Sequence, residues 1–207
     1  MNRSIQNVYC VGRNYRLHAA ELGNAVPDEP MIFLKPSHAV AALDGRELPL
    51  PADRGEVHFE GELVLSVGRT YEPGMKVDEL IDGFALGIDF TLRDVQSVLK
   101  QKGHPWTAAK GFKNSAPVSA FQPFPGTAEL EKYEFTLAKN GEELQRGNIR
   151  DMIFSLQEIV DYVAEHYGLG EGDIIFTGTP AGVGPAVKGD TFELAWKDEK
   201  LGSCRIG

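Results

Sequence analysis

The chain has 207 residues, the length of one domain, and its 42% hydrophobic and 25% charged residues are typical of a soluble globular protein. Its 30 acidic residues against 21 basic ones give a formal charge of −9, which argues against nucleic acid or an anionic membrane as a partner. We find neither a signal-peptide pattern nor a run of about 18 apolar residues, so we expect a cytoplasmic protein. Cys10 and Cys204 fit free thiols in a reducing compartment, with a single terminal disulfide as the alternative.

The predicted elements are mainly short strands, because 23 glycines exceed the usual ~7% and indicate many tight turns. In chain order the first part is expected to hold a strand at 5–11, a short helix at 15–22, a strand at 31–34, a turn-rich stretch at 43–52, a strand at 56–68, a short helix at 76–84 and a strand at 84–91. The second part is expected to hold a helix at 92–102, a hairpin at 133–148, a helix at 156–167 and strands at 173–178, 192–196 and 203–206. Strands and helices do not alternate regularly, which favours an α+β fold around an antiparallel or mixed sheet.

Two local signals in the second part predict specific structures. Asn140-Gly141 lies between two strand-like runs and is the preferred sequence for a type I′ hairpin turn. Ser155 and Glu158 have the spacing of a capping box in front of a run of apolar residues at helical spacing, and Gly168 is placed to end that helix. These signals fix the ends of one hairpin and one helix.

The most informative candidate site begins on the strand at 56–68. Glu60 and Glu62 are two residues apart, so in a strand their side chains lie on one face, about 6.5–7 Å from each other. One interpretation is a strand with one solvated polar face. The other is a cation site, because a metal ion between two carboxylates relieves their mutual repulsion.

Asp89 is a third carboxylate, and it interrupts a run of residues that is otherwise suited to a buried strand. It can pair with Arg93 at the end of that strand, or complete an all-oxygen metal site with Glu60 and Glu62. The second interpretation accounts both for the two glutamates side by side and for an acid within an apolar run. Three carboxylates without cysteine select a hard cation, Mg²⁺ or Mn²⁺, with Ca²⁺ less favoured. Such a site leaves coordination positions open for water and a chelating substrate.

Further polar residues are placed near these carboxylates or in suggestive pairs. Arg93 and Gln96 start the helix at 92–102 and can point into the site, whereas Lys100 on the same helix is expected to face solvent. Lys110 stands among small residues, as a snorkelling surface lysine or as a donor to a metal-bound anion. His18 and Glu21 face each other on a helix, either as a surface pair or as a general base with its orienting carboxylate.

The glycine-rich segment 177–185 lacks the Gly-Lys-Ser/Thr of a phosphate-binding loop and does not match a dinucleotide-binding turn. Its simplest interpretation is a loop that follows a strand. The chain also lacks the GxSxG, HExxH and CxxC patterns. The carboxylates therefore remain the main candidates for chemistry.

Several stretches together resemble the fumarylacetoacetate hydrolase superfamily, and most of all its short, single-domain branch of acylpyruvate hydrolases and oxaloacetate decarboxylases. These stretches are VGRNYRLHAAEL, PMIFLKPS, HFEGELVLSVG, GIDFTLRDVQ, KGHPWTAAKGF and GDIIFTGTPAGVGP. They follow the family order and span 11–185, nearly the whole chain. The combination of these motifs is specific, although each of them alone is weak.

The resemblance implies a single catalytic domain over 1–207, with a mixed β-sheet rolled into a barrel-like structure, a lid at about 13–30, and a homodimer. It implies that the ligands of Mg²⁺ or Mn²⁺ are Glu60, Glu62 and Asp89. It implies that the water-activating dyad is His18 and Glu21, and that the substrate and oxyanion site is lined by Arg93, Gln96, Lys110 and Thr179, with Arg13 as a weaker lid or carboxylate contact.

The expected activity is metal-dependent hydrolysis of a C–C bond in a 2,4-dioxo acid such as an acylpyruvate, with oxaloacetate decarboxylation as a related reaction. A hydratase, isomerase or decarboxylase of 2-oxo acids from aromatic (homoprotocatechuate-type) catabolism is the enzymatic alternative. A binding module with a structural cation is the non-enzymatic one. The chain has no counterpart of the extra N-terminal domain of fumarylacetoacetate hydrolase proper, so we do not expect fumarylacetoacetate as the substrate.

Overall fold

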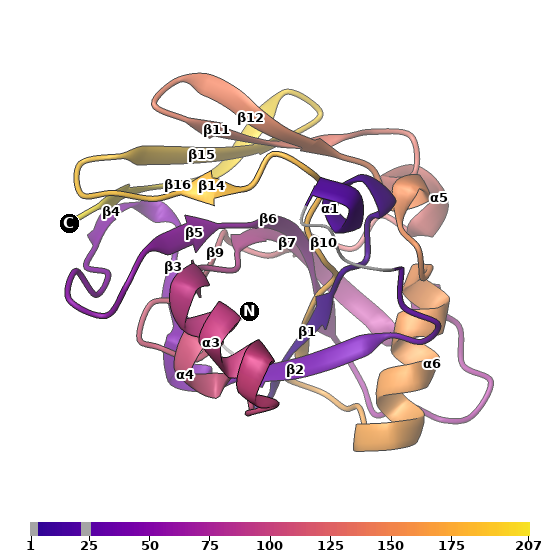
Figure 1. Ribbon diagram of the computed structural model, residues 1–207. Helices are drawn as coiled ribbons and strands as arrows, with labels where there is room; N and C mark the ends of the chain where they lie inside the picture. The colour runs from indigo at the N-terminus through magenta and orange to yellow at the C-terminus, as the bar shows by residue number, and fades with distance from the viewer. Residues whose placement is uncertain (1–3, 22–25) are drawn as a thin grey trace.

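The computed structural model describes residues 4–21 and 26–207. Over these residues it is a mixed α+β fold, with a main sheet that curls into an open barrel and a second sheet packed against one side of it (Figure 1). The main sheet, in spatial order, contains β2 (Met31–Lys35), β1 (Val8–Gly12), β13 (Ile174–Phe176), β6 (Gly61–Val67), β7 (Ile81–Ile88), β9 (Ala116–Val118) and β3 (Val40–Ala42), with β10 (Gln122–Pro123) also beside β7. The predicted fold class is confirmed.

The second sheet and a small third one complete the β structure. The second contains β12 (Glu142–Gly147), β11 (Phe135–Lys139), β15 (Thr191–Trp196), β16 (Glu199–Ile206) and β4 (Asp44–Leu48). The third contains β14 (Gly184–Pro185), β5 (Val57–Phe59) and β8 (Thr91–Leu92). The helices are α1 (Arg16–Glu21), α2 (Val77–Leu80), α3 (Arg93–Lys102), α4 (Thr107–Lys110), α5 (Thr127–Leu130) and α6 (Leu156–Tyr167), with 3₁₀ turns at Ser37–Ala39 and Ile149–Asp151.

Strand β6 is buried on both faces, and this places the site inside the molecule. Leu63 and Leu65 belong to the larger hydrophobic core, whereas Val64 belongs to a second cluster on the opposite face. Because side chains alternate along a strand, the face that holds Val64 also receives Glu62. The interpretation of this face as a solvated one is therefore wrong: Glu62 is only 2% exposed and Glu60 5%.

The strand predicted at 56–68 is two strands separated at Glu60. Strand β5 pairs with β14 and β8, whereas β6 pairs with β7 and β13, so the chain changes sheets at this residue. The turn-rich stretch 43–52 contains a strand, β4, which the alternation did not reveal because only Leu48 of its five residues is buried. The predicted helix at 76–84 ends at Leu80, where β7 begins.

The two local signals are confirmed. Asn140 and Gly141 have the positive φ angles, 54° and 84°, that a type I′ turn requires, and they join β11 to β12. Ser155 and Glu158 form the reciprocal capping box of α6. Both cysteines are buried and free. None of the described helices is long and apolar enough to cross a membrane.

Candidate active site

Three buried carboxylates meet where β5 and β7 end and β6 begins. Glu60 and Glu62 flank Gly61, which is paired with Ile88 across the β6–β7 ladder. This register brings Asp89 beside Glu60, and the Asp89 amide donates to the Glu60 carbonyl at 2.8 Å. One oxygen from each of the three carboxylates lies within 4.8 Å of the others. The predicted cluster is therefore assembled by strand pairing.

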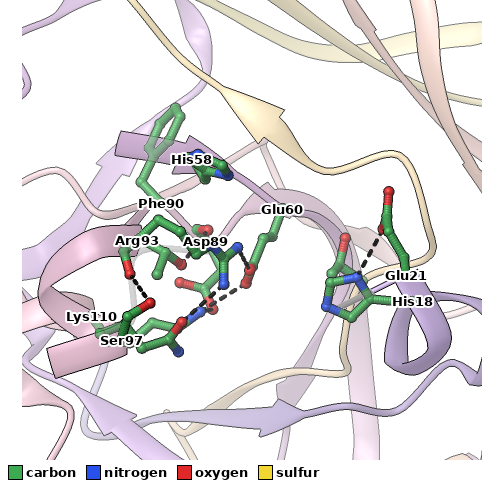
Figure 2. A network of polar contacts seen from close by, with 12 residues as sticks. His18, Glu21, His58, Glu60, Asp89, Phe90, Arg93, Ser97 and Lys110 are labelled. Atoms are coloured by element: carbon green, nitrogen blue, oxygen red, sulfur yellow. Dashed lines mark hydrogen bonds and ion pairs between the residues drawn. The ribbon is translucent and has the colours of Figure 1, made fainter. Parts of the chain in front are cut away.

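Two cations compensate part of this negative charge. The Lys110 ammonium lies 2.7 Å from Oε2 of Glu60 and 2.5 Å from Oδ2 of Asp89 (Figure 2). Arg93 contacts Oε1 of Glu60 through Nη2 at 2.5 Å. Burial opposes the charged form of Glu60, but Lys110 and Arg93 outweigh it and lower the pKa of Glu60. Burial also opposes the charge of Lys110, but Asp89 and Glu60 outweigh it and raise its pKa.

Glu62 differs from the other two acids, because no ion pair reaches it within the described ranges. Its Oε2 accepts a hydrogen bond of 2.7 Å from the Gly178 amide. Burial, Asp89 and Glu60 together raise the pKa of Glu62 well above its ordinary value. A divalent cation beside Glu62 would stabilise its ionised form. Carboxylate oxygens are also the ligands that hard divalent cations prefer. The residues present therefore fit Mg²⁺ or Mn²⁺.

Lys35, on β2, is a buried cation that the sequence analysis missed. Its Nζ lies 2.7 Å from Oδ1 of Asp89 and donates to the carbonyls of Phe90 at 3.2 Å, Ser115 at 2.9 Å and Lys110. The side chain is fully buried. Lys35 thus joins Asp89 to the backbone of the segment that presents Lys110. The available signal was a lysine at the end of an apolar strand, which sequence reasoning assigns to the surface.

The predicted dyad lies on α1, across the cavity from Glu60 and Asp89 (Figure 2). Nδ1 of His18 is 3.4 Å from Oε2 of Glu21, and the His18 side chain is only 6% exposed. Burial lowers the pKa of His18, and Glu60 and Glu21 oppose that shift only in part. The lowered pKa favours the neutral form of the His18 imidazole. The backbone amide of Gly182 contacts both Glu21 carboxylate oxygens, at 3.2 and 3.3 Å.

The remaining predicted site residues also line this cavity. Nη1 of Arg93 donates to Oε1 of Gln96 at 2.9 Å, so the two side chains at the start of α3 act as one unit. The cavity wall includes residues from six segments of the chain, namely Arg13, His18, Met31, Phe33, Glu60, Glu62, Asp89, Arg93, Gln96, Trp106, Lys110 and Thr179. Lys100 is exposed as expected, yet it also borders the cavity. Residues 22–25 of the predicted lid lie outside the described residues.

Asn14 anchors α1 to the rest of the site, a role that no local sequence pattern indicated. Its Nδ2 donates to the Thr177 carbonyl at 2.9 Å and to the Phe154 carbonyl at 3.2 Å, while its Oδ1 accepts from the Phe154 amide at 2.8 Å. The residue is fully buried. Asn14 therefore connects the start of the His18 helix to the glycine-rich loop. These partners are about 140 to 163 residues away in sequence.

Comparisons with known proteins agree with this geometry. Residues 7–206 match the model of the fumarylacetoacetate (FAA) hydrolase C-terminal family. The chain is 39% identical over 200 residues to the oxaloacetate tautomerase YcgM of Escherichia coli K12, covering 95% of this chain and 91% of the relative. It is 44% identical over 190 residues to the human mitochondrial oxaloacetate tautomerase FAHD1, covering 91% of this chain and 86% of the relative.

A solved structure extends the comparison to the fold. Fumarylpyruvate hydrolase from Pseudomonas aeruginosa, in complex with Mn²⁺ and pyruvate, superimposes with a TM-score of 0.90 at 36% identity and covers 98% of this chain and 89% of that one. The family model covers nearly the whole chain, and the two relatives exceed 35% identity over most of their length. The motifs that carried the resemblance lie together around one cavity. The chain belongs to the fumarylacetoacetate hydrolase family, in its short, single-domain branch.

Proposed function

We propose that this protein is a divalent-metal-dependent enzyme of small 2-oxo acids, and that it interconverts the keto and enol forms of oxaloacetate. The observation that carries the proposal is a buried carboxylate cluster beside Lys110, faced by a buried His18 whose pKa is lowered. The substrate is suggested by two relatives named oxaloacetate tautomerase, each matching more than 90% of the chain.

Glu60, Glu62 and Asp89 are the residues that would hold the ion. When bound, Mg²⁺ or Mn²⁺ supplies positive charge that attracts the carboxylate and 2-oxo oxygens of the substrate. Arg93 and Gln96 face the same cavity and orient the substrate by hydrogen bonds. A net charge of −9 does not prevent an anionic substrate from binding, because the cavity itself presents Arg93, Lys110 and the bound ion.

The proton transfer is assigned to His18. The neutral imidazole takes a proton from C3 of the keto form, and negative charge then develops on the C2 oxygen. Lys110 keeps its proton because Asp89 and Glu60 raise its pKa, so it stabilises that oxygen as a hydrogen-bond donor. The imidazolium returns the proton to the oxygen, which gives the enol, or to C3, which restores the ketone. No atom is gained or lost.

Hydrolysis of a 2,4-dioxo acid is the second candidate, and the contact between Glu21 and His18 favours it. In this reaction His18 removes a proton from water, the resulting hydroxide adds to the C4 carbonyl, and the C3–C4 bond breaks. The carboxylic acid leaves, and C3 of the pyruvate fragment takes up the proton. Glu21 holds Nδ1 of His18, as a water-activating dyad requires. The Pseudomonas neighbour is named a fumarylpyruvate hydrolase.

Turnover of a small panel of acids tests both candidates. Oxaloacetate is followed by the ultraviolet absorbance of its enol and by pyruvate release, and acetylpyruvate and fumarylpyruvate by loss of their own absorbance. Each is measured with Mg²⁺, with Mn²⁺ and with EDTA. With either metal ion we expect the enol absorbance of oxaloacetate to decay rapidly. With EDTA we expect this catalysed decay to disappear. If none of these acids nor a hydroxymuconate-type acid reacts in the presence of metal, the proposed function is wrong.

The metal-free protein separates an enzyme from a binding module with a structural cation. We expect EDTA to abolish turnover while circular dichroism and cooperative thermal unfolding persist, because Lys110, Lys35 and Arg93 already compensate much of the buried charge. Unfolding on removal of the metal would instead support a structural cation.

A further inference from the structure

Gln145, on β12 of the second sheet, reaches across to the carboxylate cluster. A β-bulge lies at Leu144: Leu137 pairs with Gln145 and the next residue, Ala138, pairs with Glu143. Bulges redirect side chains next to active sites. The Gln145 residue is only 1% exposed, and its amide is directed at the peptide between the two metal-site glutamates.

The Gln145 amide closes a ring of hydrogen bonds with two other residues. Its Oε1 accepts from the Gly61 amide at 2.8 Å, and its Nε2 donates to Oγ1 of Thr179 at 2.8 Å. Oγ1 of Thr179 in turn donates to the Gly61 carbonyl at 2.9 Å. Nε2 also donates to the Pro180 carbonyl at 2.9 Å. The ring therefore joins β6, β12 and the glycine-rich loop.

The chemistry of the partners fixes the direction of every bond in this ring. The Gly61 amide can only donate and the Pro180 carbonyl can only accept, so the oxygen and nitrogen of the Gln145 amide cannot exchange places. The amide nitrogen can only donate to Thr179, which leaves the hydroxyl proton for the Gly61 carbonyl. The other carbonyl near this hydroxyl, that of Pro180, is at 3.5 Å and is already bound by Gln145.

We propose that Gln145 is a positioning residue for the site: it holds the Gly61 amide directly and the Gly61 carbonyl through the Thr179 hydroxyl that it orients, and with these two peptide groups it positions Glu60 and Glu62. Toward a ligand the hydroxyl then offers a lone pair and no proton. Space supports this role, since a Cβ at Gly61 would meet Oε1 of Gln145 at 3.1 Å and Cδ1 of Leu137 at 2.9 Å. The packing thus leaves room only for glycine between the two glutamates.

The test replaces Gln145 by methionine, which keeps the volume and removes every hydrogen bond of the amide. We expect Gln145→Met to weaken Mn²⁺ binding by about 10-fold in calorimetry, as is common when a group that supports a metal ligand is lost. In the Mn²⁺-loaded protein, pyruvate binding weakens by about 10-fold. These measurements do not depend on turnover. Only the activity readout rests on the proposed function: KM for oxaloacetate rises about 10-fold, and kcat changes less than about 3-fold.

Gln157→Met is the matched control. Gln157 is also a bridging glutamine, since its Oε1 accepts from the Val77 amide at 3.0 Å and its Nε2 donates to the Met75 carbonyl at 3.1 Å. It does not line the cavity. We expect this variant to lower the melting temperature without changing Mn²⁺ or pyruvate affinity. Exchange of the Gly61 amide proton, measured by NMR, accelerates in Gln145→Met and stays as in the original protein in Gln157→Met.

Thr179 supplies a second, independent check. Thr179→Val removes the hydroxyl and is expected to weaken Mn²⁺ binding by about 10-fold, whereas Thr179→Ser keeps it and should recover most of that affinity. Thr179→Val and Gln145→Met act on the same ring, so the double variant should lose about as much affinity as one single variant. The proposal is overturned if Gln145→Met loses only stability, like Gln157→Met, or if the losses of affinity multiply in the double variant. It survives if no 2-oxo acid is turned over, because binding and exchange still report on it.

Discussion

The carboxylate cluster and the α1 helix face each other across one cavity, but the protein holds them in different ways. Asp89 and Glu60 are fixed by strand pairing and by buried lysines, and both are at most 5% exposed. Helix α1 has six residues, and Leu17 on it is 76% exposed. Its connections among the described residues include the Asn14 side chain, the backbone bridge from Tyr15 to Met152 and the contacts of Glu21. The proposed ion ligands are therefore built into the sheet, whereas the proposed base lies on a small surface element.

The largest effect is expected from the sheet side of the cavity. Glu62→Gln keeps the shape of the side chain and removes its charge, so Mn²⁺ binding should weaken by about 10³-fold and turnover should be lost. The fold should persist, because no ion pair reaches Glu62 within the described ranges and its Gly178 contact is kept by the amide oxygen. Calorimetry and circular dichroism check this. Unchanged Mn²⁺ affinity would show that the ion binds elsewhere.

His18→Ala is expected to produce the opposite pattern. Mn²⁺ affinity stays as in the original protein, while tautomerisation and acylpyruvate hydrolysis fall by about 10²- to 10⁴-fold because the base is absent. Some oxaloacetate decarboxylation is retained, since that reaction needs no attacking water. Parallel assays of the three reactions with saturating Mn²⁺ measure the difference. Equal retention of hydrolysis and decarboxylation would contradict the assignment of His18 and Glu21.

The pH dependence of kcat/KM tests the proposed role of His18, on the α1 side of the cavity. Burial lowers the pKa of His18 below its ordinary 6.5, so kcat/KM with saturating Mn²⁺ should stay level from pH 7 to below 6.5 and decline only as the imidazole becomes protonated. Glu21 raises that pKa by its hydrogen bond and its charge. Glu21→Gln should therefore move the acid limb to lower pH, by about half a unit. A shift toward higher pH would be inconsistent with His18 as the base.

The last prediction compares the same substitution, leucine to alanine, in the sheet and in α1, and concerns only the free energy of unfolding. Leu63→Ala, on β6, should lower the free energy of unfolding by about 2–5 kcal/mol, because Leu63 is only 2% exposed. Leu17→Ala, on α1, should change it by less than about 0.5 kcal/mol, because that side chain is already in solvent. Urea titration of both variants gives the two values. Similar losses would mean that α1 is packed as tightly as the sheet.

The sequence predicted the parts of the site that local patterns encode. Three acids were predicted to form one cluster. The prediction used the spacing of Glu60 and Glu62 and the interruption of an apolar run by Asp89. Helical spacing predicted the pair of His18 and Glu21. Each of these inferences needed only the period of a strand or a helix.

The contacts that organise the site were beyond such patterns, because they join residues far apart in the chain. Lys35 meets Asp89 across 54 positions, and Gln145 meets Gly61 across 84. Nothing beside Lys35 distinguishes it from a surface lysine until β2 is folded against the rest of the sheet. The break at Glu60 was hidden for a related reason: both strands alternate in the same way, and only their different partners separate them.

The position of β13 has a consequence for the order in which the molecule is made. This strand lies between β1 and β6, so it is the piece that joins the α1 side of the cavity to the carboxylate side. During synthesis α1 and the strands that carry the three carboxylates leave the ribosome long before residues 174–176. The pairing that unites them spans more than 100 residues, and such long-range contacts slow folding. If the three carboxylates hold an ion as proposed, a nascent chain should bind it only after residues 174–176 have emerged.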